Sequence, residues 1–169
     1  MPVSPEPPGP ARDPVQPADA QARALAQGLL HAARHAALAV TDPETGTPGI
    51  SRIAFGLDPQ GMPLTLISRL AAHHAALSAH PVAAVMVGDP GDKGDPLTHP
   101  RLMIRVQAEL LLRDHADHAA LRAHWLVSHP KAQLYVDFPD FSFVRLRPLS
   151  ALLNGGFGRA HRLAPDDLA

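Results

Sequence analysis

Apolar residues recur at helical spacing in three parts of the chain and at shorter intervals elsewhere. The helical segments are residues 18–36, 70–79 and 115–127. In the first of them Leu25, Leu29, Ala33 and Ala36 recur three or four positions apart, and Asp19 stands where a helix N-cap is expected. Each segment therefore predicts a helix with one apolar face to cover.

The rest of the chain has the pattern of short β-strands separated by turns. Strand-like apolar runs cover residues 36–41, 49–57, 63–68, 82–88, 102–112, 141–146 and 149–154. Turns rich in Pro, Gly and Asp follow the first two runs, at residues 42–46 and 58–61, which predicts two hairpins in series. Without a βαβ rhythm, the pattern favours a mostly β, α+β fold built as an antiparallel barrel with peripheral helices.

The first part of the chain differs in composition from the rest. Residues 1–17 contain seven prolines and few side chains that can pack. This composition predicts a disordered, proline-rich arm. We expect residues 18–169 to form one folded domain, since 169 residues fit a single core.

Composition and charge narrow the classes of function. The chain is 46% apolar, which is enough to bury a core, and its formal net charge of -1 provides no basic field for nucleic acid or an anionic membrane. The absence of cysteine excludes disulfides and thiolate metal sites. No run approaches the roughly 18 apolar residues of a spanning helix, and no leader pattern is visible. We expect a cytoplasmic protein that binds neither nucleic acid nor membrane.

Eleven histidines raise the question of a metal site. His31 and His35 are four positions apart in one predicted helix, and His115 and His118 are three apart in another. Neither pair has a third ligand at a recognised metal-binding spacing. We expect solvated or structural histidines and no metal site.

Polar side chains gather at the ends of two predicted strands. Arg52 lies in one strand, and Ser68 and Arg69 end the next, just before a predicted helix. Guanidinium groups, a hydroxyl and the free amides of a helix N-terminus together suit a phosphate group. The same side chains are also typical of the solvated face of a strand. The residues alone leave both interpretations open.

The order of these motifs resembles the pyridoxamine 5′-phosphate oxidase-like family of FMN-binding split barrels. The resemblance rests on Gly46-x-Pro48, a strand, a turn, a strand ending in Ser68-Arg69, a helix, and Pro81 before another strand. Downstream, residues 100–109, 140–146 and the glycine-rich 155–161 resemble the branch that contains haem-utilisation proteins. The resemblance covers about residues 20–163 and implies a six-stranded antiparallel split β-barrel of Greek-key type, assembled as a homodimer.

The resemblance also implies where a cofactor binds. FMN would lie at the dimer interface, with its phosphate held by Arg52, Ser68 and Arg69, while the family's usual lysine position falls on His73. Arg101 falls at the position of a polar residue that faces the flavin ring. The implied cofactor-binding residues are Arg52, Ile53, Ala54, Phe55, Ser68, Arg69, His73, His74 and Arg101.

The expected function is that of an FMN-binding flavoprotein oxidoreductase acting on an unknown small-molecule substrate or electron donor. The alternatives are a haem-binding or haem-degrading protein on the same dimeric barrel, or a non-enzymatic flavin or haem carrier. Pyridoxamine phosphate oxidases carry a tryptophan near their C-terminal end, whereas the one tryptophan here is Trp125, in the last predicted helix. Haem-degrading members ligate iron through a histidine beyond the Gly-Phe-Gly motif, a region in which this chain offers His161. No general acid or base can be assigned.

Overall fold

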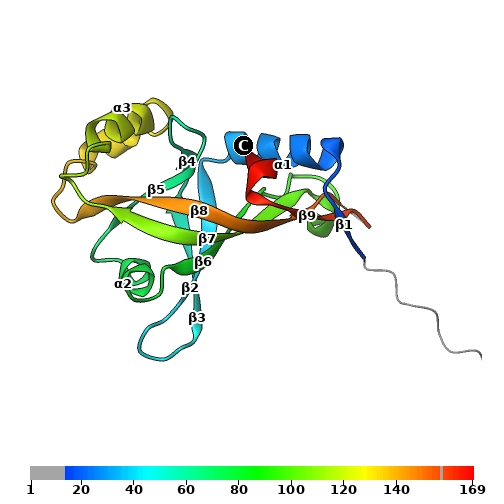
Figure 1. Cartoon of the computed structure of the whole chain (residues 1–169), viewed down its shortest axis with the longest axis horizontal. Helices are drawn as coiled ribbons and strands as arrows, with labels where there is room; N and C mark the ends of the chain where they lie inside the picture. The colour runs from blue at the N-terminus through cyan, green and yellow to red at the C-terminus, as the bar shows by residue number, and fades with distance from the viewer. Residues whose placement is uncertain (1–13, 157) are drawn as a thin grey trace, which may run out of the picture.

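The computed structural model describes residues 14–156 and 158–169, which form a mostly β structure with three α-helices (Figure 1). The strands are β1 (Val15–Pro17), β2 (His35–Thr41), β3 (Pro48–Ala54), β4 (Gly56–Leu57), β5 (Pro63–Ser68), β6 (Val82–Val87), β7 (Arg101–Leu111), β8 (Phe141–Asn154) and β9 (Ala160–Leu163). The helices are α1 (Ala20–Ala32), α2 (Ala72–Ala79) and α3 (His118–Ser128), with short 3₁₀ turns at Pro96–Thr98, Pro130–Leu134 and Pro165–Leu168. The predicted α+β class is confirmed.

One sheet joins all nine described strands, in the order β1-β9-β8-β7-β6-β2-β3, with β5 also pairing β8 and β4 pairing β5. Every pair is antiparallel except β1 with β9, which is parallel. The sheet is therefore larger than the six antiparallel strands expected. The extra members are short strands at its margins, which carry little periodicity in the sequence.

Strand β8 is the element on which the sheet is organised. Its first five residues pair with β5, its last four residues pair with β9, and β7 runs beside almost its whole length. Two predicted strands, 141–146 and 149–154, are thus one continuous strand. The register shifts where Pro148 enters it, because a bulge accommodates a residue that has no N–H to donate.

Strands β3 and β5 close the barrel without forming a ladder between them. A side chain joins them instead: the Thr65 hydroxyl donates to the Ala54 carbonyl at 2.6 Å. Thr65 is fully buried, so this hydrogen bond forms in a low-dielectric interior. The opening between the two strands is where the predicted cofactor residues converge.

Helix α1 covers one face of the sheet, beside the C-terminal segment (Figure 1). Asp19 caps it as predicted, accepting a 2.7 Å hydrogen bond from the Ala22 amide. Its buried positions are Ala22, Ala26 and Leu30, four residues apart, and the two alanines let the helix lie close to the strands. This face belongs to the larger core cluster, which fills the barrel.

Helix α3 covers a second, smaller core cluster on the other side of β8. Trp125 is almost completely buried, with its ring edge-on to Phe143 and stacked on His129 at 3.9 Å. The helix begins three residues later than the predicted 115, after Asp117, whose side chain does not cap it. Asp117 instead binds Arg145, so a tertiary contact has replaced the local cap.

An ion-pair network ties this region together. Arg145 on β8 donates to Asp58 at 2.9 Å and to Asp117 at 2.7 Å. The Asp58 side chain is only 2% exposed, and its other oxygen accepts the amides of Gln60 and Met62, which shapes the β4–β5 turn. The hydrogen bond from Arg145 holds the pKa of Asp117 below its usual value.

The boundary of the predicted arm needs a correction. Residues 15–17, placed in the arm because of their prolines, form strand β1 beside β9. Pro17 can occupy this position because β1 is an edge strand, which does not need every N–H. Residues 1–13 lie outside the described residues. In the described ranges, no helix is long and apolar enough to cross a membrane.

Candidate functional site

A cavity of about 260 Å³ opens between β3, β5 and the start of α2. It brings together five of the nine residues expected to bind a cofactor, namely Arg52, Ile53, Ala54, Ser68 and His73. Its other lining residues are Leu66, Ile67, Ala71, Tyr135 and Phe141. The cavity therefore combines an apolar floor with a few polar groups, which is typical of a small-molecule site.

Arg52 provides the positive charge of this cavity. Strand alternation places Ile53 in the core and Arg52 on the opposite, exposed face of β3. No hydrogen bond or ion pair joins the Arg52 side chain to any other residue in the described part of the chain. Arg52 also lines a neighbouring cavity of about 340 Å³ with Ile50 and Met86. A ligand larger than either cavity could thus span both and meet an unpaired guanidinium.

Ser68 and Arg69 lie at the end of β5 beside the loop that leads into β8. The Ser68 hydroxyl donates to an Asp140 carboxylate oxygen at 2.5 Å and accepts a hydrogen bond from the Leu70 amide at 3.1 Å. The Arg69 amide donates to the Asp140 carbonyl at 2.7 Å. Asp140 thus holds the end of β5 from both its backbone and its side chain.

Helix α2 begins beyond these residues, and no side chain caps its first amides. His73 and His74 lie in its first turn, both partly buried. Burial and then the charge of His74 lower the pKa of His73, while burial and then Arg69 lower the pKa of His74. Both shifts favour neutral imidazoles. A neutral imidazole offers one donor and one nitrogen lone pair, which can serve as a metal ligand.

The other predicted residues lie outside the cavity. Phe55 is completely buried in the barrel core, so its side chain is not accessible to a ligand. Arg101 begins β7, and its guanidinium donates to the Leu97 and His99 carbonyls at 3.1 and 3.5 Å. Arg69 and His74 adjoin the cavity without lining it.

Sequence reasoning missed Asp140, Tyr135 and Phe141. Tyr135 and Phe141 pack together, with ring centroids 4.9 Å apart, and form one wall of the cavity. They come after α3, far in sequence from the strands they face. The sequence shows them only as part of a cluster of aromatic residues at 135–143, which does not indicate that they face the cavity.

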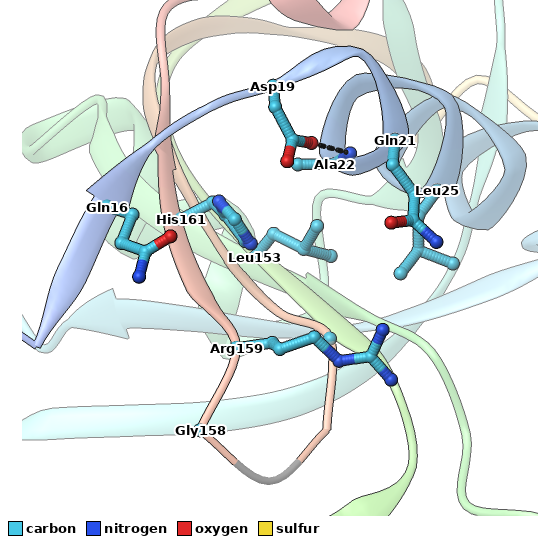
Figure 2. Close-up of a pocket in the computed structure, with 10 residues that line it drawn as sticks. Gln16, Asp19, Gln21, Ala22, Leu25, Leu153, Gly158, Arg159 and His161 are labelled. Atoms are coloured by element: carbon cyan, nitrogen blue, oxygen red, sulfur yellow. Dashed lines mark hydrogen bonds between the residues drawn. The ribbon is translucent and has the colours of Figure 1, made fainter.

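A second cavity, of about 170 Å³, lies where α1 begins beside β9 (Figure 2). Figure 2 shows Arg159 and His161 on its wall, opposite the cap that joins Asp19 to Ala22. His161 is buried, and its Nδ1 lies 3.2 Å from the Pro17 carbonyl, so this nitrogen carries the hydrogen. The Gly-Phe-Gly motif adjoins this cavity, but Phe157 lies outside the described residues.

The first pair of histidines, His31 and His35, is divided between α1 and β2, and each histidine has its own partner. His31 contacts the Gln27 carbonyl at 2.8 Å, and His35 contacts Asp89 at 2.8 Å. Within residues 14–156 and 158–169, no cluster of three or more His, Cys, Asp or Glu side chains is arranged to hold a metal ion.

Two relatives of the chain are named for haem. No family profile matches the sequence. The non-canonical heme oxygenase HOZ of Arabidopsis thaliana, a chloroplastic protein, is 36% identical over 103 residues, which are 61% of this chain and 30% of HOZ. A heme binding protein from Mycobacterium smegmatis is 30% identical, with a TM-score of 0.78, over 91% of this chain and 61% of its own.

Two further solved structures have the same fold as this chain. One is 46% identical over 90% of this chain and 98% of its own, with a TM-score of 0.81. The other, a Clostridium acetobutylicum protein of the pyridoxinephosphate oxidase family, shares the fold at 15% identity with a TM-score of 0.67, over 90% of this chain and all of its own. The chain therefore has the split-barrel fold of the pyridoxamine 5′-phosphate oxidase-like family, which its sequence resembles. The oxygenase and the mycobacterial binding protein, both named for haem, match the chain at 36% and 30% identity.

The resemblance to the pyridoxamine 5′-phosphate oxidase-like family allows the observed cavity to be compared with the phosphate site that this resemblance implies. The positions matched to this family's phosphate grip do meet at the cavity through Arg52, Ser68 and His73. The usual lysine is replaced by a neutral imidazole, and the serine hydroxyl is bound to a carboxylate. The chain spans about a third of HOZ and about three fifths of the mycobacterial protein.

Proposed function

We propose that this chain binds haem in the cavity between β3, β5 and α2. The observation that carries the proposal is that two polar groups line the same cavity above an apolar floor. They are the Arg52 guanidinium, which has no ion-pair partner, and the His73 imidazole, whose lowered pKa favours the neutral form. Haem is apolar, carries two singly charged propionates and takes a nitrogen ligand to its iron. Two of the relatives at 30% identity or more, an oxygenase and a binding protein for haem, support the same cofactor.

Different residues of the cavity would bind different parts of the haem. Arg52 pairs with a propionate through forked N–H donors, and His73 offers its lone pair to the iron. Tyr135 and Phe141 pack on the face of the ring and exclude water from it. When bound, haem would supply the redox chemistry, and the protein would orient it and set its electrostatic surroundings. The residues point to no general acid or base, so the proposal covers the binding of haem and does not include its degradation.

An FMN-dependent oxidoreductase is the second candidate function. One observation favours it: the two guanidiniums of Arg52 and Arg69 form no ion pairs in the described ranges, and they stand beside the uncapped first amides of α2. This donor set suits a phosphate. On this alternative the substrate or electron donor is a small molecule that the residues do not identify.

Substitution of Arg52 tests both candidates. Titrated by absorption spectroscopy, the wild-type protein should bind haemin more tightly than FMN. Arg52→Ala should weaken haemin by about 10- to 100-fold, the range for losing a hydrogen bond to a charged group. It should weaken FMN similarly while leaving riboflavin, which has no phosphate, unchanged. The control Arg147→Ala removes an arginine that pairs with Glu109 away from the cavity. Equal effects of the two substitutions would contradict a role for Arg52 in binding.

We also propose that the site is completed in a homodimer. Ile50, Val82 and Met86 are exposed apolar side chains on the same outer face of the sheet as Arg52. A continuous apolar face beside a cavity is typical of a protein–protein interface. A twofold partner would cover it and enclose a ligand lying across the two cavities.

Light scattering at micromolar concentration should therefore give a mass of about twice 17.9 kDa. Met86→Asp, which places a charge in this face, should shift the protein to a monomer and weaken haemin binding. A wild-type monomer that binds haemin with full affinity would contradict the shared site. For the folded protein we propose a cytoplasmic location.

A further inference from the structure

The Asp140 carboxylate lies at the edge of the proposed cofactor cavity, between the end of β5 and the cavity wall. It belongs neither to the cavity's lining nor to the family's phosphate motif. It immediately precedes Phe141, which forms part of the wall, and contacts Ser68, which lines the cavity. A role for Asp140 in ligand choice rests on the proposal that this cavity binds the cofactor.

The Ser68 hydroxyl has one proton, which already takes part in a hydrogen bond within the protein. It is donated to Asp140 at 2.5 Å, a short contact of the kind made to a charged acceptor. The oxygen of the same hydroxyl accepts from the Leu70 amide, which fixes its orientation. Ser68 therefore presents no free donor to a ligand, because a serine hydroxyl can donate only once.

Asp140 also places negative charge where an anion would bind. No described residue forms an ion pair with it, so its charge is not neutralised by a partner of its own. Repulsion between this carboxylate and a phosphate dianion is about twice the repulsion between it and a singly charged carboxylate at the same distance. The hydrogen bond to Ser68 and the negative charge of Asp140 thus both weaken the binding of a phosphate dianion.

We propose that Asp140 determines which class of anion the site accepts, by disfavouring a phosphate dianion and tolerating singly charged carboxylates such as propionates. Ser68, which matches part of the phosphate grip of the family, is thereby kept from donating to a phosphate. On this basis the chain keeps part of the family's phosphate site, with His73 at the usual lysine position, and one carboxylate turns that site towards other ligands.

The decisive variant is Asp140→Asn, titrated with FMN and with riboflavin by fluorescence quenching. Asparagine is the same size and keeps both the carbonyl that binds the Arg69 amide and a side-chain oxygen for Ser68. It removes the charge, so Ser68 can turn its proton to the phosphate. We expect FMN to bind about 10- to 100-fold more tightly than to the wild type, with riboflavin changed less than about twofold. The control Asp166→Asn removes an exposed carboxylate near the C-terminal end and should change neither ligand.

A double-mutant cycle separates the hydroxyl from the charge. Ser68→Ala should leave FMN binding unchanged in the wild type, because the hydroxyl is bound to Asp140. The same substitution should remove much of the gain in the Asp140→Asn background. An Asp140→Asn variant that binds FMN no more tightly, or that tightens FMN and riboflavin equally, overturns the inference. Haemin titration of the wild type tests the proposed function separately, since failure there leaves the FMN comparison intact.

Discussion

Replacing Arg145 with methionine should lower the free energy of unfolding by about 3–5 kcal/mol, the range for breaking a buried ion pair by removing one partner. Methionine keeps the unbranched apolar stem of the side chain, so the loss measures charge and hydrogen bonds more than packing. Arg145 is the ion-pair partner of Asp58, which is almost fully buried. Without the guanidinium, Asp58 stays in the interior with one oxygen unpaired.

Urea denaturation of two variants from the same strand would measure this. Arg147 lies two positions further along β8 on the same face, but its pair with Glu109 is exposed to solvent. Arg147→Met should therefore cost less than about 1 kcal/mol. Adding Asp58→Asn to Arg145→Met should recover part of the loss, because the buried charge is gone. Similar losses for the two arginine variants would show that burial does not set the strength of the Arg145 network.

Gly88→Ala should also destabilise the fold strongly, by about 3 kcal/mol or more, as expected for strain that neighbouring backbone cannot relieve. Gly88 follows the last residue of β6 and has a φ of +101°. A Cβ at this position would lie 2.5 Å from the Pro100 carbonyl oxygen and 2.9 Å from the Arg101 Cα. Both neighbours are backbone atoms. The loop that returns to β7 would have to move, and Arg101 would move with it.

Gly61 is the matched control for this experiment. It has a similarly positive φ of +82°, but a Cβ at this position would meet no other atom within 4 Å. Gly61→Ala should cost only about 1 kcal/mol, the penalty of a left-handed conformation for an L-residue. Thermal denaturation of the two variants separates the cost of the close approach from the cost of the dihedral angle. Equal losses would assign the effect at Gly88 to its dihedral angle alone.

What could be predicted from the sequence was decided by short-range chemistry. The Asp19 cap and the turns around residues 42–46 and 58–61 each depend on a few neighbouring residues. Such signals give the elements and their inward faces. The family resemblance then brought five residues to one cavity, which no local pattern could have done.

The features that were missed depend on contacts between distant segments. Ser68 meets Asp140 across 72 positions, and Asp58 meets Arg145 across 87. A serine in a strand predicts a free hydroxyl until its partner is known. Asp117 falls inside the predicted helix 115–127, and only the fold places Arg145 beside it. Phe55 was expected at the cofactor because it comes after Arg52 in a motif, whereas the end of β3 directs it into the core.

The pairing of β1 with β9 has a consequence for the order in which the molecule assembles. Its two strands are short, and they bring together residues 144 positions apart, as in the contact of His161 with the Pro17 carbonyl. Closing so long a loop has an entropic cost, and the hydrogen bonds of a three-residue ladder offset only a small part of it. If β2 to β8 form first, β9 and then β1 add to a finished edge, at little further entropic cost. The same pair is then the part of the sheet that opens most readily by local unfolding, ahead of any loss of the barrel.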